Sequence, residues 1–178
     1  MVRTRVGYAG GPEPAPSYHN IGGHSETIQI DYDPELISYE ELVEVFWTSH
    51  SPTTRPWSQQ YASIIFYHDE EQRRLAEESR ELQVTQQGRE IYTEIVPYSD
   101  FHLAEFYHQK YRLQQVPELS NEFLTLFPDE RDFIDSTAVA RVNGYLGGHG
   151  TLEELETHID NLGLSSAGKA KLREIVAR

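Results

Sequence analysis

The chain has 178 residues, which is enough for one ordinary domain or for a domain with an appendage. Fifteen basic residues stand against 29 acidic ones, so the net charge of −14 repels nucleic-acid phosphates and anionic lipids. No apolar run approaches the ~20 residues of a membrane-spanning helix, and the first residues contain no apolar stretch of signal-peptide length. We therefore expect a cytoplasmic protein that binds neither membranes nor nucleic acid.

The sequence contains no cysteine, which excludes a disulfide, a thiolate nucleophile and a thiolate metal site within these residues. It also lacks the Gly-Lys-Ser/Thr phosphate loop, the glycine-rich dinucleotide loop and the His-Glu-x-x-His zinc motif. Its eight histidines are better explained by packing and solvent exposure than by metal binding. We expect no bound cofactor and no metal.

The first part of the chain alternates between strand and helix patterns. Residues 2–8 are β-branched and alternating, and they end at a Gly-Gly pair followed by three prolines, as a strand entering a rigid loop would. The alternation in residues 26–32 predicts a half-buried strand with Glu26 on its apolar face. Ser38 and Glu41 have the spacing of a capping box, which predicts the start of a helix. Later segments predict strands over 61–67 and 91–96, with a charged helix over about 69–86 between them.

The rest of the chain carries only helical signals. Residues 137–146 have helical apolar spacing and end in a Gly-Gly pair, and Thr151 with Glu154 forms a second capping box. We predict a mixed domain over 1–116 and a helical C-terminal extension over 117–178. The order of the elements indicates a two-layer α+β fold, in which helices cover a mixed sheet.

Glu26 is the residue with the most evident chemical potential. A carboxyl group on a buried strand face loses solvation, which favours its protonated form and suits it to act as a general acid. Taken alone, however, Glu26 is better explained as a water-facing strand end, because buried glutamates are rare. By composition alone, Tyr18 and Tyr61 are amphipathic packing residues.

A series of short motifs occurs in order between residues 2 and 111. They are GYAGG at 7–11, Pro-Ser-Tyr at 16–18, Gly-His-Ser-Glu at 23–26, Tyr-Asp-Pro at 32–34, ISYEELVEVFW at 37–47, His50 with Pro52-Thr53, Gln60-Tyr61, YTEI at 92–95 and AEFYHQKY at 104–111. In this order the motifs resemble the A-class peptide methionine sulfoxide reductases. Each motif alone is a weak signal, but the ordered series is a specific one.

The resemblance implies an enzyme that reduces the S-epimer of methionine sulfoxide, free or in oxidised proteins, on a ferredoxin-like core. In the family, a cysteine or selenocysteine in a Gly-Cys-Phe-Trp motif attacks the sulfoxide sulfur. By motif match, the acid that protonates the oxygen would be Glu26, and the two hydroxyls that hold it would be Tyr18 and Tyr61. An external thiol of the thioredoxin or glutathione type would regenerate the enzyme.

The sequence departs from the family in one decisive respect, because it contains no Gly-Cys-Phe-Trp motif. We expect an N-terminally truncated form that lacks the first strand, the first helix and the nucleophile, and we regard the full-length protein as a selenoprotein candidate. The first alternative is a non-catalytic relative that binds methionine sulfoxide or a partner through the remaining acid and tyrosines. The second is an interaction module whose acidic surface and C-terminal helices dock a basic partner.

Overall fold

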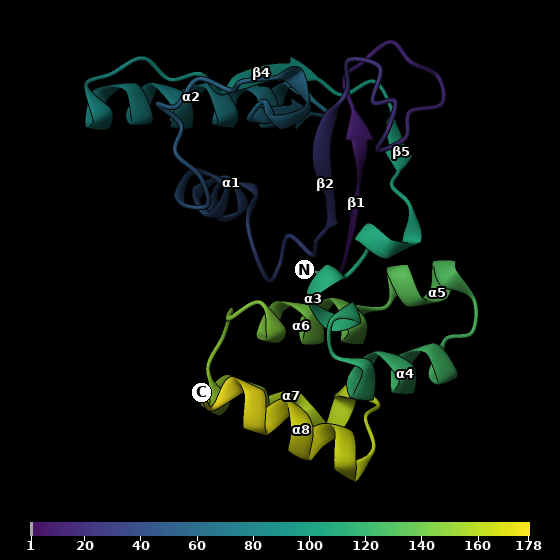
Figure 1. Ribbon diagram of the computed structural model, residues 1–178. Helices are drawn as coiled ribbons and strands as arrows, with labels where there is room; N and C mark the ends of the chain where they lie inside the picture. Colours follow the sequence, from purple (N-terminus) through teal and green to yellow (C-terminus); the bar gives the residue numbers. More distant parts are fainter. Residues whose placement is uncertain (1) are drawn as a thin grey trace. The chain divides into compact units, whose positions relative to one another are not determined.

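The computed structural model describes residues 2–178, which pack as two compact units (Figure 1). One unit is Val6–Ala104, and the other combines Glu105–Arg178 with the first residues up to Arg5. The first unit contains strands and helices, whereas the second consists of helices together with the start of β1. The predicted α+β class is confirmed. The predicted domain boundary after residue 116 stays a prediction.

Three strands form one sheet in the order β2-β1-β5. They are β1 (Arg3–Ala9), β2 (Ser25–Asp31) and β5 (Phe101–Leu103). Strand β1 pairs antiparallel with β5, and Gly7 lies opposite Leu103. The first two strands match the predicted ones, but β5 was not predicted because three residues are too short to show an alternating pattern.

A second sheet consists of the parallel strands β3 (Ile64–Tyr67) and β4 (Glu94–Pro97). The strands therefore form two small sheets, in place of the single mixed sheet that we predicted. Both strands also begin three residues later than predicted. The backbone before each strand bonds elsewhere: Tyr61 N–H donates to the Ser58 carbonyl in a 3₁₀ turn, and Tyr92 N–H donates to the Pro52 carbonyl.

Two helices pack with this second sheet. Helix α1 (Tyr39–Thr48) begins with the predicted capping box, and helix α2 (Glu70–Gln87) is the predicted charged helix, with Asp69 as its N-cap. The Trp47 indole N–H donates a hydrogen bond of 3.0 Å to Ser79, which joins α1 to α2. The buried core of this region consists of Val43, Trp47, Ile65, Ala76 and Ile91.

The helical unit has the larger apolar core. Its elements are η2 (Phe106–His108), α3 (Tyr111–Gln114), α4 (Pro117–Leu126), α5 (Glu130–Asp135), α6 (Thr137–Leu146), α7 (Leu152–His158), η3 (Ile159–Leu162) and α8 (Ser166–Val176). The predicted capping box of Thr151 and Glu154 opens α7. The fully buried side chains in the core of the helical unit include Leu113, Leu119, Phe123, Phe133, Val139, Leu155 and Leu172.

Polar side chains hold the start of β1 within the helical unit. The Arg5 guanidinium, almost fully buried, donates to the Asp135 carboxylate over 2.6 Å. Lys110 Nζ donates to the carbonyl and the hydroxyl of Thr4. Desolvation lowers the pKa of Lys110 from its ordinary 10.5 to about 8, although the nearby Asp135 charge works in the opposite direction. Among residues 2–178, no helix is both long and apolar enough to cross a membrane.

Candidate active site

The three predicted site residues come from different segments of the Val6–Ala104 unit. Tyr18 lies in the loop between β1 and β2, Glu26 is the second residue of β2, and Tyr61 ends the 3₁₀ turn η1 (Gln59–Tyr61). The Tyr18 hydroxyl hydrogen-bonds with that of Tyr61, and the Glu26 carboxylate is close enough to influence the ionisation of Tyr61. The fold therefore brings the three residues together.

The structure confirms the water-facing interpretation of Glu26 and contradicts the buried one. Glu26 is exposed, and Ile28, on the same face of β2, is 57% exposed. The alternation correctly identified which side chains share this face. However, the face opens onto a cavity and no packed layer covers it.

Partial desolvation raises the pKa of Tyr61, and so do the Glu26 charge and the Tyr18 hydroxyl. Each effect disfavours the phenolate form of Tyr61. Desolvation penalises its negative charge, and the Glu26 carboxylate repels it. Tyr61 therefore keeps its proton at neutral pH and can donate a hydrogen bond to an oxygen atom placed between these groups.

Hydrogen bonds hold the 3₁₀ turn against β2. Gln60 Nε2 donates to Glu26 Oε1 over 2.8 Å, which orients the carboxylate. The buried Ser25 hydroxyl donates to the Gln59 carbonyl over 2.6 Å, and Gln59 Nε2 donates back to Ser25 Oγ. The positions of Glu26 and Tyr61 are thus coupled. In the sequence, the only signal for Gln60 is its place in the Gln60-Tyr61 motif.

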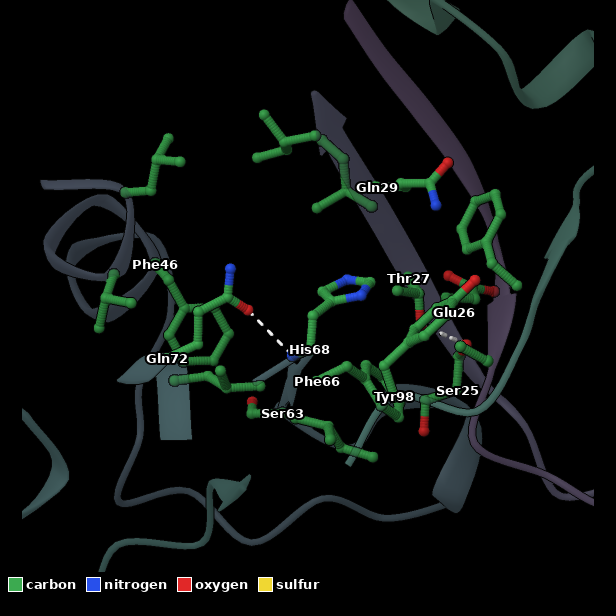
Figure 2. A pocket seen from close by; sticks show the side chains of 18 of the residues that line it. Ser25, Glu26, Thr27, Gln29, Phe46, Ser63, Phe66, His68, Gln72 and Tyr98 are labelled. Carbon is green, nitrogen blue, oxygen red and sulfur yellow. Dashed lines mark hydrogen bonds between the residues drawn. The ribbon is translucent and has the colours of Figure 1, made fainter. Parts of the chain in front are cut away.

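A cavity of about 410 Å³ adjoins this cluster (Figure 2). Strands β2 and β3 line it, each at the edge of its own sheet, together with Phe46 of α1. Its wall combines apolar side chains such as Phe66 with polar ones such as Glu26 and His68. The cavity can therefore accept a mainly apolar group beside the carboxylate.

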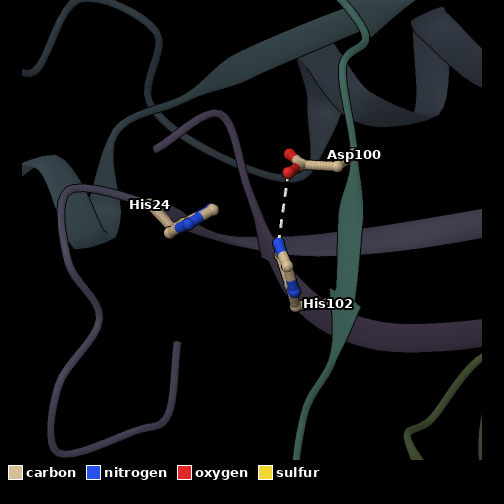
Figure 3. A group of neighbouring side chains, drawn as sticks. All are labelled: His24, Asp100 and His102. Carbon is tan, nitrogen blue, oxygen red and sulfur yellow. Dashed lines mark hydrogen bonds and ion pairs between the residues drawn. The ribbon is translucent and has the colours of Figure 1, made fainter. Parts of the chain in front are cut away.

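His24, Asp100 and His102 form the one cluster of potential metal ligands found among residues 2–178 (Figure 3). The buried His24 ring already uses both nitrogens: Nδ1 accepts from Gly11 N–H over 3.1 Å, and Nε2 donates to the Glu13 carbonyl over 2.8 Å. Asp100 instead pairs with His102 over 3.2 Å. We therefore interpret His24 as the residue that fastens the proline-rich loop to the start of β2.

A carboxyl group with two phenol hydroxyls beside it can bind an oxygen atom that gains negative charge, and can supply it with a proton. Such a set suits reductases that remove oxygen as water, which include the oxidoreductases acting on sulfur-containing groups. The comparisons with known proteins agree with this class. Residues 1–141 match the family model described as peptide methionine sulfoxide reductase, and residues 129–177 match the helical domain described for selenoprotein methionine sulfoxide reductase A.

Individual relatives support the same assignment. The chain is 42% identical to a peptide methionine sulfoxide reductase of Drosophila melanogaster, in a match that covers 93% of this chain and 67% of the relative. It is 36% identical to peptide methionine sulfoxide reductase A5 of Oryza sativa, with 98% and 71% covered. Among solved structures, methionine sulfoxide reductase A of Corynebacterium diphtheriae superimposes with a TM-score of 0.59 and 30% identity, covering 66% of this chain and 65% of that one.

The chain belongs to the peptide methionine sulfoxide reductase family. Members of this family reduce methionine sulfoxide to methionine, which reverses oxidative damage to proteins. The substrate class is therefore a sulfoxide, and the electrons come from a thiol reductant.

Proposed function

We propose that Glu26, Tyr18 and Tyr61 bind the oxygen of an S-epimer methionine sulfoxide and protonate it. The observation that carries the proposal is the proximity of these three side chains from three separate segments: Tyr18 is hydrogen-bonded to Tyr61, and the Glu26 charge acts on Tyr61. Tyr18 and Tyr61 donate hydrogen bonds to the sulfoxide oxygen. Glu26 donates a proton to that oxygen when a thiol attacks the sulfur. Overall, two thiols supply two electrons and two protons, the sulfur–oxygen bond breaks, a disulfide forms, and the oxygen leaves as water.

The reaction also needs a nucleophile to attack the sulfoxide sulfur, and these 178 residues contain no thiol. We infer that a segment carrying cysteine or selenocysteine enters the cavity between the edge strands β2 and β3 and brings that atom beside Glu26. An edge strand offers unpaired backbone groups to an added strand. The selenocysteine form is supported by the match of residues 129–177 to a domain described for a selenoprotein.

Four further features belong to the same proposal. A thioredoxin- or glutathione-type thiol regenerates the nucleophile, and the substrates are oxidised proteins or free methionine sulfoxide. The cytoplasm is the expected compartment, because thiols are kept reduced there. Residues 1–116 form the reductase domain and 117–178 a helical extension.

The binding part of the proposal can be tested on the chain itself. Calorimetric titration with N-acetyl-(S)-methionine sulfoxide methylamide is expected to show binding, and the R-epimer is expected to bind more weakly. Glu26→Gln, Tyr18→Phe and Tyr61→Phe should each weaken binding by about tenfold or less, as expected for the loss of one hydrogen bond. Tyr98→Phe is the matched control, because Tyr98 lines the cavity and stacks on His68 at a ring distance of 4.3 Å. Equal binding by all variants and both epimers would refute the proposed site.

The nucleophile part of the proposal needs a second experiment. A synthetic strand peptide that contains Gly-Cys-Phe-Trp, added to the chain with dithiothreitol, is expected to start reduction of the sulfoxide. The peptide without the chain, and a peptide with serine in place of cysteine, are the controls. If the chain adds nothing to the rate of the peptide alone, the cavity does not receive the nucleophile.

A further inference from the structure

Trp57 is the most exposed aromatic side chain near the proposed site. It is 82% exposed, although an indole is among the largest apolar side chains and gains most from burial. Its ring centroid lies 4.8 Å from that of Tyr61, with the two rings inclined by 35°. Trp57 thus lies at the protein surface, beside the proposed site residue Tyr61.

The backbone that carries Trp57 is held in place. Trp57 directly precedes Ser58, whose carbonyl accepts from Tyr61 N–H over 3.2 Å at the start of the 3₁₀ turn. The Ser25 hydroxyl fastens the same turn to β2 through the Gln59 carbonyl. Because the hydrogen bonds of the turn hold the backbone next to Trp57, a ligand that covers the indole has less backbone entropy to remove.

We propose that Trp57 binds an apolar side chain close to the oxidised methionine in a polypeptide substrate, so that the site prefers peptides to free methionine sulfoxide. This inference rests on the proposed oxygen-binding role of Glu26, Tyr18 and Tyr61. A single sulfoxide methyl group is too small to cover an indole that is open over most of its surface. In an extended peptide, side chains two positions apart share one face and are separated by roughly 7 Å. When the oxidised methionine lies at Tyr61, the side chain two positions away can therefore contact the neighbouring Trp57 indole.

An apolar side chain packed on an exposed tryptophan is a contact typical of recognition sites. Exposed tryptophans account for a large share of the binding energy at protein interfaces, because they bury much apolar area at low entropic cost. The net charge of −14 adds a restriction, because acidic peptides are repelled. Neutral or basic sequences with an apolar residue beside the methionine are the expected substrates.

Binding of two capped pentapeptides tests the inference. Both have (S)-methionine sulfoxide at the centre, and one has leucine at each end while the other has glycine. The leucine peptide is expected to bind about tenfold more tightly than the glycine peptide or N-acetyl-(S)-methionine sulfoxide methylamide. Trp57→Ala should remove this advantage without changing the affinity for the single residue, and Trp57→Phe should keep most of it. Leu82→Ala, which removes an apolar side chain that is 61% exposed on α2, is the control.

Fluorescence quenching provides a second readout. The chain has two tryptophans, of which Trp47 is 6% exposed and Trp57 is 82% exposed, so acrylamide should quench mainly Trp57. The leucine peptide should protect Trp57 from acrylamide, and the single residue should not.

The possible outcomes separate this inference from the proposed function. If the single residue binds wild-type protein but Trp57→Ala leaves the advantage of the leucine peptide intact, the inference is overturned and the oxygen-binding site stands. If Trp57→Ala weakens the binding of all three ligands equally, Trp57 belongs to the site itself and the inference is also overturned. If wild-type protein binds none of them, both proposals fail.

Discussion

The ion pair between Arg5 and Asp135 offers a quantitative test of how the helical unit is held together. Asp135 accepts from Arg5 Nε over 2.6 Å and from Arg131 Nε over 2.9 Å, and the side chains of Arg5 and Asp135 are only 9% and 19% exposed. Asp135→Asn keeps an oxygen acceptor for Arg5 but leaves a buried guanidinium without its counter-charge. Removing one partner of a buried pair costs about 3–5 kcal/mol, so we expect a loss near the lower end, about 3 kcal/mol.

Urea unfolding followed by circular dichroism at 222 nm measures this loss. With a slope of about 2 kcal/mol per molar urea, the midpoint should fall by about 1.5 M. Asp132→Asn is the matched control, because Asp132 lies on the same short helix but is exposed, and it should change the midpoint little. Tryptophan fluorescence reports separately on the other unit, which contains Trp47 and Trp57.

The decisive check is how the difference in unfolding free energy between wild type and Asp135→Asn depends on pH. Burial opposes ionisation of Asp135, but the hydrogen bonds and charges of Arg5 and Arg131 outweigh it and lower its pKa. The stabilisation is therefore present above the unfolded-state pKa of about 3.9, and it is lost as the pH falls through the lower folded-state pKa. Wild type and Asp135→Asn should differ most near pH 7 and converge in acid. A difference below 0.5 kcal/mol at pH 7, or one that does not shrink in acid, would refute the reasoning.

Three other predictions concern separate parts of the chain. Because the pKa of Lys110 falls to about 8 on folding, its charged form is disfavoured in the folded state, so wild-type stability should rise from pH 8 towards 10.5. Lys110→Met should lack this rise in urea titrations at each pH, and a parallel rise in both proteins would contradict it. Gly7→Ala should destabilise the β1–β5 pair by about 2 kcal/mol in thermal unfolding, because its Cβ would lie 2.2 Å from the His102 carbonyl oxygen. The chain alone should produce no methionine from methionine sulfoxide, even with stoichiometric protein and dithiothreitol, because it has no thiol; product above the rate of dithiothreitol alone would disprove the mechanism.

Several features of this protein could be read directly from the sequence. Both capping boxes, at Ser38 and Thr151, depend on residues three positions apart, and both helices begin where these residues predict. The first two strands and the helical character of the C-terminal part follow from patterns that span about ten residues. The ordered motifs led to the correct family, because they combine many local signals along one chain.

Tertiary structure decided the features that depend on distant residues. Alternation placed Glu26 and Ile28 on one face of β2, but only the packing determines whether another layer covers that face, and here it opens onto a cavity. The three-residue strand β5 exists because β1 offers it a partner. Likewise, the proximity of Tyr18, Glu26 and Tyr61 depends on how a loop, a strand and a 3₁₀ turn meet in space. Periodicity records which side chains share a face, whereas burial and proximity arise from contacts between segments that local patterns do not encode.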